Sequence, residues 1–288
     1  AVALRAMLAP GDEVLVPEPS YVSYSPSVIF AGGTPVGVET REDTDFRLSA
    51  EKVRAAITPR TKLLILPYPN NPTGGIMTRK DLEAIAEVLR DTNILVLTDE
   101  IYSELTYGRK HVSIASIDGM WERTIYVSGF SKAFAMTGWR LGYVCAPEPI
   151  AKQMLKIHQY AIMSAPTLSQ YAAIVALREC DKDVQKMVEE YNVRRRMLVD
   201  GFNRIGLTCF NPEGAFYMFP CIRSTGMSSE EFCEKLLQEE KVAVVPGNAF
   251  GDSGEGFVRV SYAYSLKHLQ EALRRMENFV NRHQGESK

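Results

Sequence analysis

Short apolar segments alternate with segments of helical periodicity through the first two-thirds of the chain, and this alternation restricts the fold more than any other feature. The apolar segments are nearly continuous runs of Val, Ile and Leu, which is typical of strands buried on both faces. Strands are predicted at residues 13–16, 34–39, 62–67, 94–98, 124–128 and 142–146, with helices at 20–31, 49–57 and 78–90. The pattern predicts an α/β fold in which helices cover both faces of a mostly parallel sheet.

The pattern changes near residue 150, where helical periodicity becomes dominant and strands become short. Helices are predicted at residues 150–163, 168–178, 184–204, 229–241 and 266–282, and strands at 216–222, 242–245 and 257–262. This α+β pattern predicts a smaller C-terminal domain, so we expect a large domain at residues 1–185 and a small one at 186–288. A length of 288 residues agrees with about two domains.

Charge and composition exclude several classes of protein. The 33 basic and 35 acidic side chains nearly cancel, whereas a nucleic-acid-binding protein normally carries a basic surplus. No apolar run approaches the roughly 18 residues that a membrane-spanning helix needs. The 5 cysteines are scattered without a CxxC pair and the 4 histidines lack metal-ligand spacing. We therefore expect a cytoplasmic protein without a metal site, and neither nucleic acid nor membrane as a partner.

Polar motifs follow three predicted strands at their carboxyl ends, where open α/β sheets bind ligands. Asn70-Asn71-Pro72-Thr73-Gly74 follows the third strand, Asp99-Glu100-Ile101-Tyr102 the fourth, and Ser128-Gly129-Phe130-Ser131-Lys132 the fifth. Each motif has an ordinary explanation when taken alone: a turn, a helix cap or a surface lysine. Their common position at strand ends favours a single site.

In this order the motifs resemble those of the pyridoxal-phosphate-dependent class I/II aminotransferases of fold type I. The stretch from Ser131 to Arg140, SKAFAMTGWR, is close to diagnostic, and the resemblance extends to PGNAF and RVSY near the C-terminal end. It implies pyridoxal 5′-phosphate as the cofactor and ping-pong transfer of an amino group between an L-amino acid and a 2-oxo acid. Such enzymes are homodimers with sites at the subunit interface, so we expect a homodimer.

The resemblance assigns the central chemistry to two residues. Lys132 forms the Schiff base with the cofactor and then shuttles a proton. Asp99 supplies the negative charge that keeps the pyridine nitrogen protonated, which the ring needs in order to accept electrons. Glu100 is excluded, because the next side chain of an extended segment points to the opposite side.

The remaining assignments also come from the resemblance. Asn71 and Tyr102 donate hydrogen bonds to the phenolic oxygen of the cofactor, which lowers the basicity of the imine. Tyr21 stacks on the pyridine face; ordinary core packing is the alternative for this residue. Arg259 clamps the α-carboxylate of the substrate, with Asn71 beside it, and comes from the small domain, which can close over the site.

The phosphate contacts are assigned to Arg140, whose planar fork suits a phosphate group, and more weakly to Ser131. Many relatives carry a serine three residues before the lysine, where this chain has Gly129. In relatives a phosphate-binding loop precedes the helix that leads into Pro10-Gly11-Asp12. We expect residues 1–10 to be the end of that helix and the N-terminal part of the family fold to be missing, so that this chain alone binds the cofactor weakly or not at all.

Two alternatives remain open. A β-lyase would keep the fold, the cofactor and the carboxylate clamp, and a non-catalytic aminotransferase-like sensor module would keep the fold alone. The segments DEIYSELTY (99–107), KIHQY (156–160) and STGM (224–227) resemble a bacterial branch that includes N-acetyl-diaminopimelate and aromatic aminotransferases. The identities of the amino acid and of the oxo acid stay open at this point.

Overall fold

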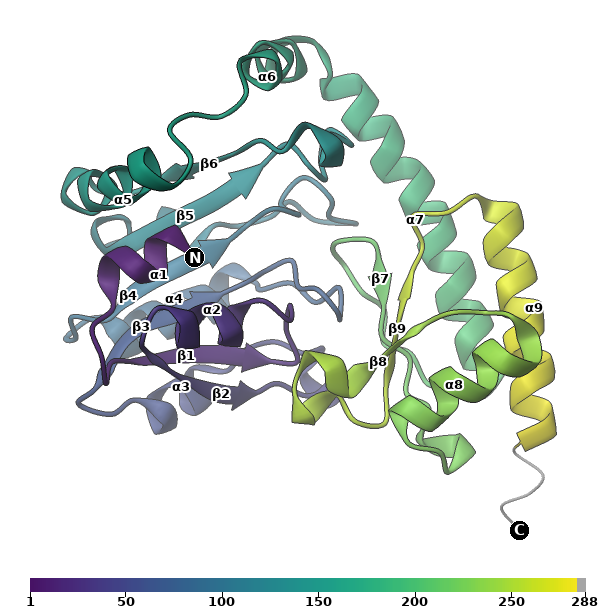
Figure 1. Cartoon of the computed structure of the whole chain (residues 1–288). Coiled ribbons are helices and arrows are strands. Elements are labelled where there is room, and N and C mark those ends of the chain that lie inside the picture. Colours follow the sequence, from purple (N-terminus) through teal and green to yellow (C-terminus); the bar gives the residue numbers. More distant parts are fainter. Residues whose placement is uncertain (284–288) are drawn as a thin grey trace.

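The computed structural model describes residues 1–283 and contains two sheets (Figure 1). The larger sheet has 6 strands in the order β2-β1-β3-β4-β5-β6. Its strands are β1 (Glu13–Glu18), β2 (Thr34–Glu39), β3 (Thr61–Leu66), β4 (Leu95–Asp99), β5 (Thr124–Gly129) and β6 (Gly142–Cys145). All neighbouring strands are parallel except β5 and β6. The mostly parallel α/β sheet predicted from the sequence is therefore confirmed.

Alternate residues of each inner strand enter two different cores. In β3, Leu64 and Leu66 pack with helices α3 (Ala50–Ala56) and α4 (Arg79–Leu89) on one face of the sheet. Leu63 and Ile65 pack on the other face against three helices. These are α1 (Val2–Met7), α2 (Tyr24–Phe30) and α5 (Glu148–Ala161). Because helices cover both faces of the sheet, the inner strands do not show the alternation of apolar and polar residues that a sheet with one exposed face has.

Of two helices near the N-terminus, one agrees with the sequence prediction and the other begins later than predicted. The helix end predicted at residues 1–10 is α1. The helix predicted at residues 20–31 begins only at Tyr24. The Ser20 amide instead donates to the carbonyl of Phe250, at 3.0 Å. This contact with a distant part of the chain keeps residues 20 and 21 out of the helix.

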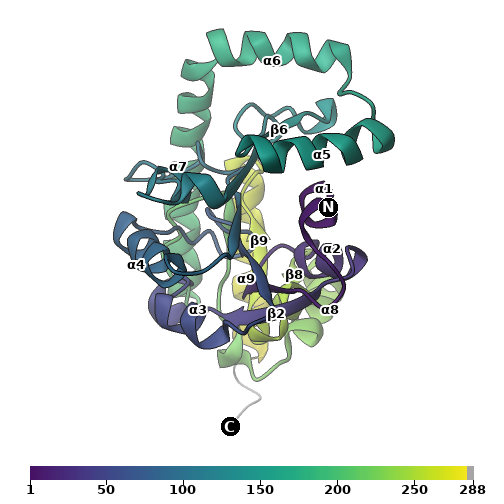
Figure 2. The ribbon, with the colours of Figure 1, turned by 90° about the vertical axis from the view of Figure 1, so that its left-hand side faces the viewer.

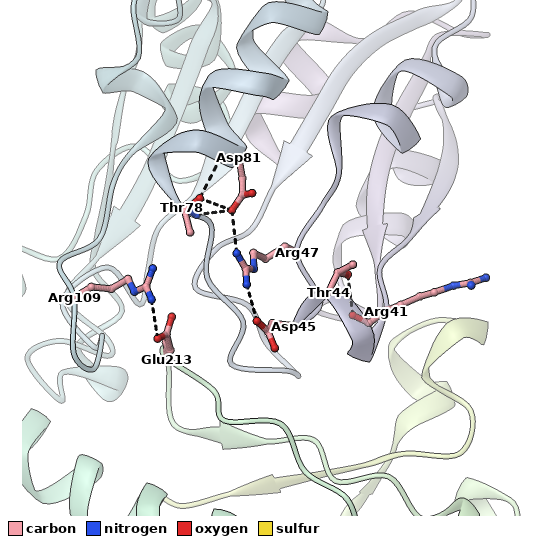
Figure 3. Close-up of polar contacts among 8 residues, drawn as sticks. All are labelled: Arg41, Thr44, Asp45, Arg47, Thr78, Asp81, Arg109 and Glu213. Carbon is pink, nitrogen blue, oxygen red and sulfur yellow. Dashed lines mark hydrogen bonds and ion pairs between the residues drawn. The ribbon is translucent and has the colours of Figure 1, made fainter.

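The start of α4 is fixed by a capping box, which anchors the segment that follows the Asn-Pro-Thr-Gly motif. The Thr78 hydroxyl accepts from the Asp81 amide at 3.2 Å, and the Asp81 carboxylate accepts from the Thr78 amide at 2.9 Å (Figure 3). Such reciprocal bonds satisfy two of the unpaired amides of a helix N-terminus. The Arg47 guanidinium lies 3.7 Å from the same carboxylate.

The C-terminal part of the chain forms the second sheet and its own core. Three short strands lie in the order β7-β9-β8. The elements are α6 (Thr167–Glu179), α7 (Asp181–Arg204), β7 (Tyr217–Met218), α8 (Ser229–Glu240), β8 (Val245–Pro246), β9 (Val258–Ser261) and α9 (Leu266–His283). The strand predicted at 216–222 is much shorter in the structure. Pro220 lies within it and has no amide to donate to a neighbouring strand.

Residues 213–215 connect this part to the ends of β3 and β4. The Gly214 amide donates to the carbonyl of Gly74, and the Ala215 amide donates to that of Leu105, both at 2.9 Å. Gly74 has φ +75°, and a side chain there would come within 2.6 Å of Pro212. The Arg109–Glu213 ion pair, 3.1 Å long, supports the same junction (Figure 3). The segment therefore holds β7 close to the strand ends that carry the predicted motifs.

Candidate active site

A cavity of about 460 Å³ lies at the carboxyl ends of β3, β4 and β5, next to β7 and β9. All eight residues predicted from the motifs line it: Tyr21, Asn71, Asp99, Tyr102, Ser131, Lys132, Arg140 and Arg259. Its volume is in the range typical of sites for small ligands. The tertiary structure thus brings together side chains that lie up to 238 positions apart in the sequence, from 21 to 259.

The loop after β5 places Lys132 and the phosphate candidates on the wall of this cavity. The Thr137 hydroxyl donates to the carbonyl of Ser131 at 3.0 Å, and the Arg140 guanidinium donates to the carbonyl of Thr137 at 2.8 Å. Arg140 itself adopts a left-handed conformation with φ 51°. This compact turn brings two hydroxyls and a guanidinium to the same cavity as the Lys132 amine.

Gly129 is explained by the close approach of β6 to β5. A Cβ atom at this position would lie 2.9 Å from the Gly142 Cα and 3.0 Å from the Leu141 carbonyl oxygen. A serine here therefore requires β6 to move. The Ser128 and Ser131 side chains line the cavity on either side of this position.

Asp99, at the end of β4, is held by a tyrosine from α2. The Tyr24 hydroxyl donates to the Asp99 carboxylate at 2.9 Å, and the Ile101 amide donates to it at 3.2 Å. Burial raises the pKa of Asp99, although these two hydrogen bonds lower it. Burial also raises the pKa of Tyr24, which therefore stays a neutral donor. A buried carboxylate with a raised pKa suits a cationic ring nitrogen as its partner.

Glu100 points to the opposite side of the strand end, as its position after Asp99 predicts. Its carboxylate accepts a hydrogen bond from the Ser113 hydroxyl at 2.6 Å and lies 2.6 Å from the His111 Nε2. The side chain is 1% exposed and does not line the cavity. Only one of the two adjacent acids therefore faces the site.

Tyr102 contacts the C-terminal sheet through its hydroxyl. The Tyr102 and Tyr217 hydroxyl oxygens are 3.0 Å apart and share a hydrogen bond. Burial raises the pKa of Tyr102 far above its usual value. The Lys132 amine lies 6.0 Å from the centre of the Tyr102 ring and 5.7 Å from that of Phe216. Two aromatic rings therefore flank the Lys132 amine at the cavity.

Arg259 reaches the cavity from β9. Its Nη1 donates to the Asn71 side-chain oxygen at 3.0 Å. Its guanidinium lies 4.8 Å from the centre of the Tyr217 ring and 4.9 Å from that of Phe250. The Nε atom is buried and has no hydrogen-bond partner among residues 1–283. An arginine with an unused buried donor, facing a cavity, suits a carboxylate ligand.

Tyr21 is 43% exposed and stands edge-on to Tyr24, with ring centres 5.7 Å apart. Its ring lines the cavity, so core packing does not account for its position. Tyr24, Thr137 and Tyr217 also line the cavity, although they are not among the predicted site residues. Tyr217 lies in the run GAFYMF at the start of a predicted strand, and Thr137 lies inside the SKAFAMTGWR motif. Tyr24 gives no local signal, because its partner Asp99 is 75 residues away.

The donor set of the cavity fits pyridoxal phosphate. It contains a carboxylate for the ring nitrogen, an amine for the aldehyde, a phenol and an amide for the phenolic oxygen, and hydroxyls with a guanidinium for the phosphate. The fold and this site define a pyridoxal-phosphate-dependent enzyme of fold type I that acts on amino acids.

The chain belongs to the aminotransferase class I and II family, whose model matches residues 1–276. It is 50% identical to an aspartate aminotransferase of Pyrococcus abyssi over 280 residues, which are 96% of this chain and 72% of that protein. It is 48% identical to an aromatic-amino-acid aminotransferase of Thermococcus litoralis, again over 96% of this chain and 72% of that protein. The crystal structure of an aromatic aminotransferase from Pyrococcus horikoshii superimposes with a TM-score of 0.96, 48% identity and coverage of 98% of this chain and 76% of that one. The protein is therefore an aminotransferase that uses pyridoxal phosphate.

Proposed function

We propose that the eight predicted residues that line the cavity carry out transamination in the roles that the resemblance assigns to them. The observation that carries the proposal is the contact between Arg259 and Asn71, which lie 188 residues apart and meet beside Lys132 in one cavity. Bound pyridoxal phosphate supplies an aldehyde for the amino group and a ring that accepts electrons.

Arg259 binds and orients the α-carboxylate of the amino acid. Its Nε is available for this contact because no side chain of residues 1–283 satisfies it. A guanidinium that contacts two rings and one amide has little freedom to turn, so the carboxylate is fixed in one direction. Positioning of this kind places the Cα hydrogen of the substrate within reach of a base.

Lys132 is the base that takes the proton from Cα and would deliver it to the former aldehyde carbon of the cofactor, and the second half-reaction would run both transfers in the opposite direction. Asp99 holds a proton at the ring nitrogen, with Tyr24 keeping its carboxylate oriented. Tyr102 and Asn71 donate at the phenolic oxygen. Arg140 and Ser131 bind the phosphate, and Tyr21 covers one face of the ring.

A donor screen tests the proposed reaction. The chain is loaded with pyridoxal phosphate and mixed with one amino acid at a time, without an oxo acid. Stoichiometric conversion into pyridoxamine phosphate with release of the matching 2-oxo acid supports transamination and ranks the substrates. Release of ammonia and pyruvate instead indicates a β-lyase and contradicts the proposal. Because the relatives named above act on aspartate or on aromatic amino acids, both classes belong in the screen.

We also propose that residues 1–185 and 186–288 act as two domains. Each part has its own sheet, and a separate core joins α7, α8 and α9. Helix α7 begins at Asp181, so the boundary lies within its first turns. Cooperative unfolding in two steps, followed by calorimetry, supports this division, and a single step contradicts it.

A homodimer is proposed from the apolar surface of α5 and α6, which lie along one margin of the molecule (Figure 2). Tyr160 is 95% exposed, Met163 80%, Leu168 79% and Tyr171 68%. Exposed apolar patches of this kind are typical of protein interfaces. Light scattering of the chain tests the dimer, with Leu168→Glu expected to dissociate it; a monomeric wild-type chain contradicts it.

Among residues 1–283 no helix is long and apolar enough to cross a membrane. With the cysteine pattern, this supports a cytoplasmic location.

A further inference from the structure

Tyr217 contacts two of the proposed functional residues with two different parts of its side chain. Its hydroxyl shares a hydrogen bond with the Tyr102 hydroxyl at 3.0 Å. Its ring lies 4.8 Å from the Arg259 guanidinium. The side chain is buried, with 7% exposed, and lines the cavity. One residue of the C-terminal sheet thus connects the proposed carboxylate clamp with a proposed donor to the cofactor.

The ring of Tyr217 lies 4.8 Å from the Arg259 guanidinium, and the ring of Phe250 lies 4.9 Å from it. No carboxylate of residues 1–283 forms an ion pair with this guanidinium, whose one hydrogen bond is to Asn71. The positive charge is therefore stabilised by ring faces, which attract a cation without neutralising it. This arrangement leaves the charge available for the carboxylate of a ligand.

The hydroxyl of Tyr217 affects which acceptor the Tyr102 hydroxyl donates its proton to. Tyr102 is neutral, because burial raises its pKa, and so it has one proton to donate. When Tyr217 donates to the Tyr102 oxygen, the Tyr102 proton remains available for the cofactor. A hydroxyl that accepts one hydrogen bond is also a stronger donor in the next.

The backbone before Tyr217 holds this side chain in place. Ala215 adopts a left-handed conformation with φ 57°, which is uncommon for a residue with a side chain. Its carbonyl accepts hydrogen bonds from the Tyr107 hydroxyl at 2.5 Å and the Tyr262 hydroxyl at 3.0 Å. Strand pairing then places Tyr217 opposite Ser261, two residues after Arg259.

We propose that Tyr217 is a positioning residue that holds the Arg259 guanidinium with its ring and directs the Tyr102 proton toward the cofactor with its hydroxyl. The inference rests on the proposed roles of Arg259 and Tyr102. The ring and the hydroxyl of Tyr217 have separate roles in this proposal, so that removing the hydroxyl and removing the ring have different effects.

The experiment compares Tyr217→Phe with Tyr217→Leu in the chain loaded with pyridoxal phosphate. Calorimetry gives the affinity for 3-phenylpropanoate, a carboxylate that cannot react, and absorbance gives the pH midpoint of the spectral change of the bound cofactor. The Phe variant keeps the ring, so we expect affinity within about twofold of wild type and a midpoint higher by on the order of half a pH unit. The Leu variant loses both parts, so we expect about tenfold weaker binding and the same rise of the midpoint.

Tyr68→Phe is the matched control, because it removes another buried tyrosine hydroxyl, bonded to the Phe46 carbonyl at 2.8 Å, outside the cavity. It should leave both readouts unchanged. Circular dichroism verifies folding, and Tyr217→Met replaces the Leu variant if that variant does not fold.

Leu-variant binding within twofold of wild type overturns the role of the ring, and a Phe-variant midpoint that is unchanged or lower overturns the role of the hydroxyl. A wild-type chain that binds pyridoxal phosphate but converts no amino donor contradicts the proposed function itself, and the inference then falls with it. Unchanged carboxylate binding in Arg259→Lys contradicts the clamp, and with it the role of the ring.

Discussion

The Tyr24 hydroxyl lies 2.9 Å from the Asp99 carboxylate, a contact between the first helix after β1 and the end of β4. The hydrogen bond stabilises the ionised carboxylate, whose pKa burial raises. The balance between these two effects decides how readily Asp99 carries the charge that the proposed function requires.

Tyr24→Phe should therefore raise the pKa of Asp99 further and weaken the binding of pyridoxal phosphate. A hydrogen bond to a charged group contributes about 1.5–3 kcal/mol, so we expect a loss of about tenfold or more in cofactor affinity. Equilibrium dialysis measures it at pH 8. The exposed Tyr264→Phe is a control that should change nothing, and equal affinities of the Tyr24 variant and wild type would argue against the role of this contact.

Asp99→Asn should abolish turnover and yet stabilise the cofactor-free chain. The folded pKa of Asp99 lies above the unfolded one, so ionisation destabilises the folded state at pH values above both and has no effect below both. We expect the melting temperature of the variant to exceed that of wild type by about 2–4 °C at pH 8. The difference should shrink as the pH approaches about 4. A variant that melts below wild type at pH 8 would be inconsistent with this account.

Lys132→Ala should lower turnover by on the order of 1,000-fold or more, because the variant lacks both the amine and the base. Within residues 1–283 the Lys132 amine forms no ion pair and lies 5.7 and 6.0 Å from the centres of two aromatic rings, so the fold should remain intact. Turnover with the best amino donor is the measurement, and Lys267→Ala, an exposed lysine of α9, is the control. Retained turnover would refute the assigned role.

Arg259→Lys should raise the KM for the amino acid by about 10- to 100-fold with a smaller effect on the melting temperature, because lysine lacks the planar fork. Steady-state kinetics provide the measurement. Arg223→Lys is a suitable control, since Arg223 also stacks on a ring, that of Phe257 at 4.6 Å, but lies outside the cavity. An equal change of KM in both variants would contradict a specific clamp.

Gly129→Ala should destabilise the chain by about 1–3 kcal/mol, since the new methyl group would collide with the backbone of β6 at 2.9 Å. Gly138→Ala lies in the loop that follows β5, with no atom within 4 Å of the new methyl group, and should be nearly neutral. Denaturant unfolding of both variants tests the expectation. Similar free energies of unfolding for the two variants would mean that β6 accommodates the methyl group without loss of stability.

The strands and most helices could be predicted because their causes are local. Continuous apolar runs mark strands buried on both faces, and Leu63 to Leu66 divide between two cores as that pattern requires. The helix predicted from residue 20 starts later, because its first amide bonds to Phe250, 230 positions away. No local periodicity carries that information.

The same distinction applies to the site. By themselves the residues determined the α/β class and, through the strand-end motifs together with the family resemblance, the eight predicted side chains that meet in the cavity. Only the tertiary structure decided their partners: Tyr24 with Asp99, Tyr217 with Tyr102, and Asn71 with Arg259, separated by 75, 115 and 188 residues. The physical reason is that backbone geometry acts over a few residues, whereas the direction of a buried hydrogen bond and the pKa of a buried acid depend on every element packed around them.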